Sequence, residues 1–235
     1  MYPHITAYIA DDPSGLTPIA QSFLAQETKR GLIGWGDDKD EVLSEYRENF
    51  DGDGTEFWDF LHYLRMRYGG LSYESRGWVL SDVAFQPFAE LDPEDGMPLV
   101  SLIESFGSPV GVFASLDGAI HYFPEGVDDP RPVRVFPSVD ALIESCAMYA
   151  DSEGWIEVAG GRGEDLDAVV GQAGELDLLT APSGTFEWWW EGAGVRVHAS
   201  KTIAELRSDP SEARWKVWAR DESGVSAARH FAGRS

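Results

Sequence analysis

The sequence predicts an α+β fold in which N-terminal helices pack on an antiparallel sheet meander. Three observations support this prediction. Apolar residues recur at helical spacing through about the first 70 positions, a period-two pattern with a hairpin turn begins after residue 77, and helical spacing returns at residue 139. Helices before and after a run of strands indicate an antiparallel sheet, whereas regular alternation of strand and helix indicates a parallel one.

Three helices are expected in the first 70 residues. The first covers residues 17–30, because Thr17 can cap it and Pro18 suits the first helical position. The second covers about 39–50 and directs most of its glutamates outward. The third covers about 55–67, where one apolar stripe follows helical spacing: Phe57, Phe60, Leu61, Leu64 and Tyr68.

The centre of the chain is expected to form a hairpin, a third strand and a helix. Asp117-Gly118 between two apolar runs favours the positive φ angles of a tight hairpin turn. Ser138 suits the capping position of the helix that follows. The expected elements are strands at 110–115, 119–123 and 133–136 and a helix at 139–150.

Clustered glycines between residues 154 and 163 indicate a boundary. We therefore expect one α+β domain over residues 1–155 and a Trp-rich α+β segment or subdomain over 156–235. The elements expected in the second part are a helix at 164–179, strands at 186–190 and 195–199, a short helix at 201–208, and a hairpin of strands at 215–220 and 225–230.

The composition argues against several classes of protein. Forty-one Asp and Glu residues against 18 Lys and Arg give a net charge of -23, which repels nucleic acids and anionic membranes. A 43% hydrophobic content is enough for a packed core. The chain has no run of 18 apolar residues, no signal-peptide pattern at its start and one cysteine, so a cytoplasmic protein without internal disulfides is expected.

Motifs for catalysis or cofactor binding are missing from the sequence. The five histidines have no His or Cys partner at metal-ligand spacing, and Cys146 falls on the apolar face of its helix, where we expect a buried, unreactive thiol. Residues 49–54 imitate the first half of a calcium-binding loop, but Phe60 stands where the bidentate Glu belongs, so a capped turn is expected. We name no catalytic residue, no cofactor and no metal, and we expect no enzyme.

An acidic surface is the leading functional candidate. Between residues 37 and 59, ten acids accompany only two cations, Lys39 and Arg47. Because crowded like charges lower stability, we interpret this segment as a docking surface for a basic protein; a merely solvated surface is the alternative. The candidate partner-binding residues are Asp37, Asp38, Asp40, Glu41, Glu45, Glu48, Asp51 and Asp53. A second acidic set follows in a loop: Glu90, Asp92, Glu94 and Asp95.

Two tryptophans extend the candidate site. In the expected strands, Trp189 alternates onto the face of Glu187, and Trp218 alternates onto the face of Lys216 and Arg220. Exposed tryptophan beside charged residues is typical of interface hot spots, so Trp189 and Trp218 join the candidate partner-binding residues. The alternative is that a second layer or a neighbouring domain covers both.

Short motifs in the central part follow one another in a specific order. An amphipathic helix ends in Tyr68–Leu71, Trp78 falls in an early strand, and the hairpin Phe113–Phe123 precedes Phe136–Leu142. In this order, residues 55–150 resemble the SUKH superfamily. The resemblance implies an α+β fold, and many SUKH members are immunity proteins that neutralise toxins used in competition between bacteria. It implies no catalytic residues.

The sequence departs from this family at both ends. The glutamate-rich helices before residue 55 are extended, and the Trp-rich segment after residue 155 has no counterpart. We expect a cytoplasmic immunity or antitoxin-like protein whose partner is a cognate protein toxin with a basic active-site surface, and no direct nucleic-acid or membrane contact. Two alternatives stay open. One is an acidic-cleft enzyme or small-ligand-binding protein, favoured by a deep pocket lined by acids and Trp189 or Trp218; the other is a regulatory adaptor.

Overall fold

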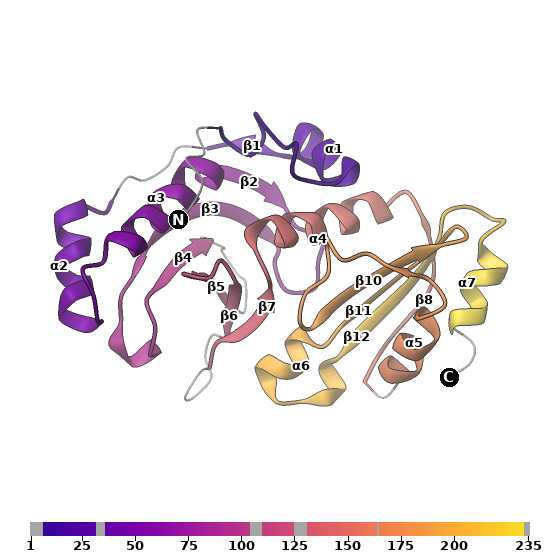
Figure 1. The fold of residues 1–235 in the computed structure, drawn as a ribbon. Coiled ribbons are helices and arrows are strands. Elements are labelled where there is room, and N and C mark those ends of the chain that lie inside the picture. Colours follow the sequence, from indigo (N-terminus) through magenta and orange to yellow (C-terminus); the bar gives the residue numbers. More distant parts are fainter. Residues whose placement is uncertain (1–6, 32–35, 104–109, 125–130, 164, 233–235) are drawn as a thin grey trace.

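The computed structural model describes residues 7–31, 36–103, 110–124, 131–163 and 165–232 (Figure 1). In this part of the chain, helices pack on two antiparallel sheets, which confirms the α+β class. Strands β1 to β7 form the first sheet in sequence order, and the second sheet has the order β8-β12-β11-β10-β9. No described helix is long and apolar enough to cross a lipid bilayer.

The elements have the following bounds. The helices are α1 Pro18–Glu27, α2 Lys39–Asn49, α3 Thr55–Tyr68, α4 Val139–Ser152, α5 Asp165–Ala173, α6 Thr202–Arg207 and α7 Val225–Ala232, with short 3-10 turns η1 Pro93–Asp95 and η2 Pro210–Glu212. The strands are β1 Lys29–Arg30, β2 Leu71–Glu74, β3 Asp82–Glu90, β4 Leu99–Ile103, β5 Val110–Ser115, β6 Ile120–Pro124, β7 Val133–Phe136, β8 Ile156–Arg162, β9 Asp177–Leu178, β10 Glu187–Gly192, β11 Val195–Ser200 and β12 Arg214–Ala219.

The predicted elements of the first 150 residues form where local signals place them. The Thr17 side chain caps α1, the Ser138 side chain caps α4, and Gly118 at φ +84° closes the β5–β6 hairpin. Two details differ from the expectation. Residues 29–30 leave the helix to pair with β2 as strand β1, and Trp78 lies in the connection between β2 and β3 instead of in a strand.

Helix α4 is the central element of the molecule, because it lies between the two sheets (Figure 1). Leu142, Ile143 and Ala147 join the core of the first sheet, whereas Met148 packs against Trp189 and Trp218 of the second sheet. A helix that is buried nearly all round is typical of a position inside a larger structure. Helix α4 therefore connects the packing of the two sheets.

The second sheet has helices on one face and α4 on the other. Helices α5 and α7 cover the face that carries Val195 and Val197, with Val169 and Phe231 in the same apolar cluster. The opposite face carries the alternate residues of β10, β11 and β12, which are polar or aromatic. This face meets α4, so polar side chains of the strands lie inside the molecule.

The expected strand at 225–230 is wrong, because this segment forms α7. Its intended partner, β12, already pairs with β8 on one side and β11 on the other, so no edge of β12 is free for a hairpin. As a helix, the segment places Ala228 and Phe231 on the apolar face of the sheet. The helix expected over 164–179 is also too long: it ends at Ala173, and β9 pairs with β10.

Candidate functional site

The predicted acidic residues gather on and around α2, at the end of the molecule away from the second sheet (Figure 1). They fall into two groups. Three of them have structural roles: Asp37 pairs with the buried Arg65, Asp38 caps α2, and Asp53 accepts a 2.9 Å hydrogen bond from the Thr55 amide. The Thr55 bond also lowers the pKa of the Asp53 carboxyl. These three acids are committed to the fold.

Five acids in this segment have no such role. Each is exposed, and none forms an ion pair or side-chain hydrogen bond with another described residue: Asp40, Glu41, Glu45, Glu48 and Asp51. Asp40 and Glu41 lie in the first turn of α2, where the helix dipole favours negative charge. Glu48 lies in the last turn, where the dipole disfavours it. The charge of Glu48 therefore opposes the stability of its own helix.

The second acidic set is continuous with the first in space. Burial raises the pKa of Glu90, and the carboxylates of Asp95, Asp92 and Glu45 raise it further. The Asn49 side chain donates a 2.8 Å hydrogen bond to the Leu91 carbonyl, which holds the end of α2 against this loop. We call the combined surface the acidic face, made up of Asp40, Glu41, Glu45, Glu48, Asp51, Glu90, Asp92, Glu94 and Asp95.

The expected exposure of Trp189 and Trp218 is wrong. The relative exposure of Trp189 is 0% and that of Trp218 is 5%, and their rings stack at 6.0 Å between centroids. The Trp189 indole donates a 3.0 Å hydrogen bond to Ser145 of α4. The alternative interpretation, that a second layer covers both tryptophans, is confirmed, because Met148 of α4 packs against them. The two side chains hold the molecule together and are not accessible to a partner.

Beside Trp189 lies a buried polar network that the sequence did not indicate. The His198 imidazole lies 2.6 Å from a Glu187 carboxylate oxygen through Nε2 and 3.0 Å from the Tyr149 hydroxyl through Nδ1. The other Glu187 oxygen accepts 2.8 Å bonds from the hydroxyls of Ser200 and Thr202. Burial raises the pKa of Tyr149, which keeps its hydroxyl protonated. The sequence predicts no metal site at His198, and the partners of its ring are a carboxylate and a phenol.

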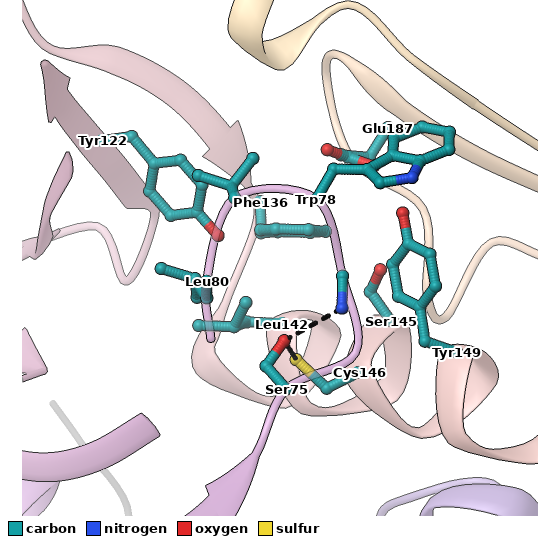
Figure 2. Close-up of a pocket in the computed structure, with 12 residues that line it drawn as sticks. Ser75, Trp78, Leu80, Tyr122, Phe136, Leu142, Ser145, Cys146, Tyr149 and Glu187 are labelled. Carbon is teal, nitrogen blue, oxygen red and sulfur yellow. Dashed lines mark hydrogen bonds between the residues drawn. The ribbon is translucent and has the colours of Figure 1, made fainter. Parts of the chain in front are cut away.

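A small cavity lies next to this network (Figure 2). Trp78, Tyr122, Cys146 and Glu187 contribute to its wall, and its volume is about 30 Å³. That volume holds roughly two water molecules, at about 10–15 Å³ each. Burial raises the pKa of the Cys146 thiol to about 11, so it stays a thiol at neutral pH, and its predicted burial is confirmed. A site of this size has no space for a substrate.

A larger cleft, with a volume of about 340 Å³, opens between the end of α4 and strands β8 and β12 of the second sheet. Its wall includes Trp155 and Trp218, and ion pairs at 2.9 Å close its polar side: Arg76 with Glu153, and Lys216 with Glu157. The cleft therefore contains the acids and the tryptophan that the small-ligand alternative requires. Both acids are already paired with cations.

A wider hollow, about 990 Å³, is an open groove between α5 and α6. Arg162 and Lys201 supply its positive charges, and Asp167 and Glu205 balance them. Lys201 and Asp167 form a 3.0 Å ion pair across it. With its charges balanced, this groove shows no preference for an anion or a cation.

The turn at 49–54 is a helix connection, as predicted. Asp53 accepts a hydrogen bond from the Thr55 amide at the start of α3, and the N-cap residue Gly54 adopts φ +79°. Within the described ranges, no three His, Cys, Asp or Glu side chains are grouped in a way that would hold a metal ion.

Comparisons with protein-family models, with curated protein sequences and with solved structures gave no match to this chain. The resemblance of residues 55–150 to the SUKH superfamily therefore stays a prediction. The function has to be inferred from the surface and the buried chemistry described above.

Proposed function

We propose that this chain is a binding protein that neutralises a basic protein toxin by covering it, as an immunity protein does. The observation that carries this proposal is the acidic face. It brings together carboxylates from two distant segments, and those of α2 at Glu45 and Glu48 have no compensating partner among the described residues.

Electrostatics explains what such a surface does well. Complementary charge steers a partner toward the right orientation and can raise the association rate from about 10⁵–10⁶ to about 10⁸–10⁹ M⁻¹s⁻¹. A protein that must intercept a toxin before it acts benefits from fast association. The net charge of -23 favours basic partners over nucleic acids and anionic membranes.

The resemblance to the SUKH superfamily supports the same function. Its expected order of elements is a helix ending near Tyr68, an early strand with Trp78, a hairpin around Asp117-Gly118, a short strand and a helix capped by Ser138. Helix α3, the β5–β6 hairpin, β7 and α4 follow in that order, whereas Trp78 lies in the connection between β2 and β3. In this proposal the partner is the product of a neighbouring gene, and the chain acts stoichiometrically. A regulatory adaptor would use the same surface with a partner that is not a toxin.

The test compares two charge-matched double variants. Glu45→Gln with Glu48→Gln removes two charges from the acidic face, and Glu205→Gln with Glu222→Gln removes two exposed charges from the other half of the molecule. We expect the first pair to weaken binding of the neighbouring-gene protein about tenfold at about 50 mM salt, with the loss much smaller at about 500 mM. The second pair should change the affinity less than about twofold.

Two outcomes would contradict this function. One is the absence of binding by any basic neighbouring-gene protein in co-expression and pull-down. The other is an affinity that neither salt nor the α2 substitutions change. A partner that binds but whose toxicity is unaffected would point to the adaptor instead.

The cleft lined by Trp155 and Trp218 supports a second candidate function, small-ligand binding. A volume near 340 Å³ is within the range of ligand pockets, and aromatic walls with a few polar groups are typical of them. A shift in melting temperature with a metabolite panel, abolished by Lys216→Ala with Trp155→Ala, would establish it. If no compound shifts the melting temperature, this candidate is excluded for that panel.

A further inference from the structure

A row of phenylalanines lies on the face of the first sheet opposite the core. The core face is identified by Val100, Val112 and Tyr122, which pack with residues of four helices. These helix residues are Leu24 of α1, Leu64 of α3, Leu142 of α4 and Leu206 of α6.

Side chains alternate along a strand, so the intervening residues point away from the helices. Phe88, Phe113 and Phe123 hold these positions, and none belongs to an apolar cluster of the described residues. Phe88 is 43% exposed.

The three side chains follow one another across four strands, with Phe88 exposed, Phe113 and Phe123 half-buried, and the buried Ser101 between Phe88 and Phe113. Phe88 on β3 pairs with Ser101 on β4, and Ser101 pairs with Phe113 on β5. Phe113 meets Phe123 of β6 edge to face, with 4.8 Å between centroids. Because neighbouring strands lie about 4.8 Å apart, the patch extends about 14 Å from β3 to β6.

A glycine makes the patch flat. A Cβ atom at Gly111 would lie 2.6 Å from the Phe113 ring, so the ring rests directly on the glycine backbone. Phe113 therefore lies along the sheet instead of projecting from it. We call Phe88, Phe113 and Phe123 with Gly111 the phenyl patch.

The phenyl patch joins the acidic face at Glu90. Glu90 follows Phe88 by two residues, and the two share a side of β3 because their partners, Leu99 and Ser101, are also two apart. The pKa of Glu90 responds to Glu45 of α2. Apolar centre and charged margin are thus contiguous, and an apolar patch with a polar rim is the usual anatomy of a protein interface.

The cationic groups on this face add little positive charge. Arg134 is paired with Asp117 at 2.9 Å. His121 lies between Phe113 and Arg134 in the cross-strand row, and burial lowers its pKa, which favours the neutral imidazole at neutral pH. The partner that complements this surface has an apolar patch bordered by Lys or Arg.

We propose that the phenyl patch is the apolar centre of the contact with the basic partner protein, and that the acidic face is its charged margin. The proposal rests on the proposed function and adds the location of the short-range contact. Carboxylates steer the approach through long-range charge, whereas the rings hold the docked complex by apolar burial, which salt does not screen.

The experiment places a photo-crosslinking residue, p-benzoylphenylalanine, at three exposed positions of the full chain in its native host. Phe88 reports on the phenyl patch and Ser44 on α2, and Leu178, an apolar residue of similar exposure at 48%, serves as the control on the second sheet. We expect the same basic protein to cross-link from positions 88 and 44 and not from 178. A parallel variant, Phe88→Ser, should lower the affinity about tenfold at both low and high salt.

Each other result has a definite meaning. Cross-links from 44 alone leave the proposed function standing and overturn the phenyl patch as its centre. Cross-links from neither position, or only to proteins without a basic surface, overturn both. Equal cross-linking from 88 and 178 identifies non-specific apolar contact and also overturns the inference, as does a Phe88→Ser affinity equal to that of the wild type.

Discussion

The indole nitrogen of Trp189 and the hydroxyl of Ser145 form a 3.0 Å hydrogen bond that joins the second sheet to α4. Both groups are buried, so neither can exchange this partner for bulk water. Ser145 also lies beside the small cavity in Figure 2. The second sheet is therefore held against α4 by a buried hydrogen bond as well as by apolar packing.

Ser145→Ala should destabilise the protein by about 1–3 kcal/mol, because it leaves the indole N–H buried without an acceptor. Adding Trp189→Phe should cost less than Trp189→Phe in the wild-type background, since the polar conflict is then removed. Urea unfolding followed by circular dichroism measures both values. Strict additivity of the two substitutions would show that the bond contributes nothing.

Glu187→Gln should destabilise the protein by about 2–3 kcal/mol. The carboxylate receives hydrogen bonds from Ser200 and Thr202 and contacts His198, so an amide would turn an NH₂ group toward one of these donors. Glu157→Gln is the matched control, because Glu157 pairs at the surface with Lys216 and with no other residue that the structure describes. We expect the control to cost less than about 0.5 kcal/mol. Equal effects of the two variants would mean that the buried network has no special role.

The Trp189 contact also shows where prediction from sequence ends. Alternation correctly placed Trp189 and Glu187 on the same face of their strand, but it does not say which face of a sheet another element covers. Here α4 covers the face with more polar residues, and internal partners replace water. That choice depends on contacts between residues more than 40 positions apart.

Local signals were more informative. Caps at Thr17 and Ser138 and the Asp117-Gly118 turn act over a few residues, and the structure forms these features where they were predicted. The segment at 225–230 was misassigned because its fate depends on whether β12 has a free edge. The sequence alone predicts the cluster of acids on α2. Their proximity to Glu90 and the phenyl patch could be seen only in the folded structure.

The pH dependence of stability should report on Glu90. Its pKa is raised in the folded protein by burial and by neighbouring carboxylates, so the folded state binds this proton more tightly than the unfolded chain does. Stability from this group is present below the unfolded pKa, near 4.5, and is lost as pH rises through the folded value. Glu90→Gln should therefore be more stable than the wild type at pH 7, with the difference vanishing below about pH 4.

Unfolding free energies measured in urea between about pH 3 and pH 8 test this expectation. Asp117→Asn is the contrast, because hydrogen bonding to Ser115 lowers the pKa of Asp117. It should lower stability at pH 7, and its deficit should shrink as pH falls through the depressed pKa. Parallel pH profiles for the two variants would show that the fold does not perturb these groups as described.

Neutralising α2 should improve stability while impairing binding. Glu48→Gln removes a charge that the helix dipole disfavours, and Glu45→Gln removes a charge that raises the pKa of Glu90. We expect the double variant to be more stable than the wild type at low salt, by about 0.3–1 kcal/mol. Thermal unfolding at about 10 mM and about 500 mM salt checks this, with the gain largest at low salt.

Asp38→Ala is the control for that experiment. Asp38 is an acid of the same segment, but it caps α2, so its removal should destabilise the protein by about 0.5–2 kcal/mol. If all acids of the segment behaved like Asp38, the acidic face would be a feature of stability and its interpretation as a binding surface would lose its physical basis.

Gly111→Ala should weaken partner binding without changing any charge. An added Cβ would come within 2.6 Å of the Phe113 ring and force it to lift from the strand, away from Phe123. The φ angle of Gly111 lies outside the positive range, so the backbone itself accepts alanine. We expect an affinity loss of about three- to tenfold, equal at low and high salt, because the lost contact is apolar.

The matched control is Gly171→Ala, since no atom lies within 4 Å of the Cβ position there. It should leave the affinity unchanged. A readout that needs no partner is the nuclear Overhauser contact between the Phe113 and Phe123 rings, which Gly111→Ala should abolish and Gly171→Ala should preserve. If the ring contact is lost while the affinity stays at the wild-type value, the partner does not bind on the phenyl patch.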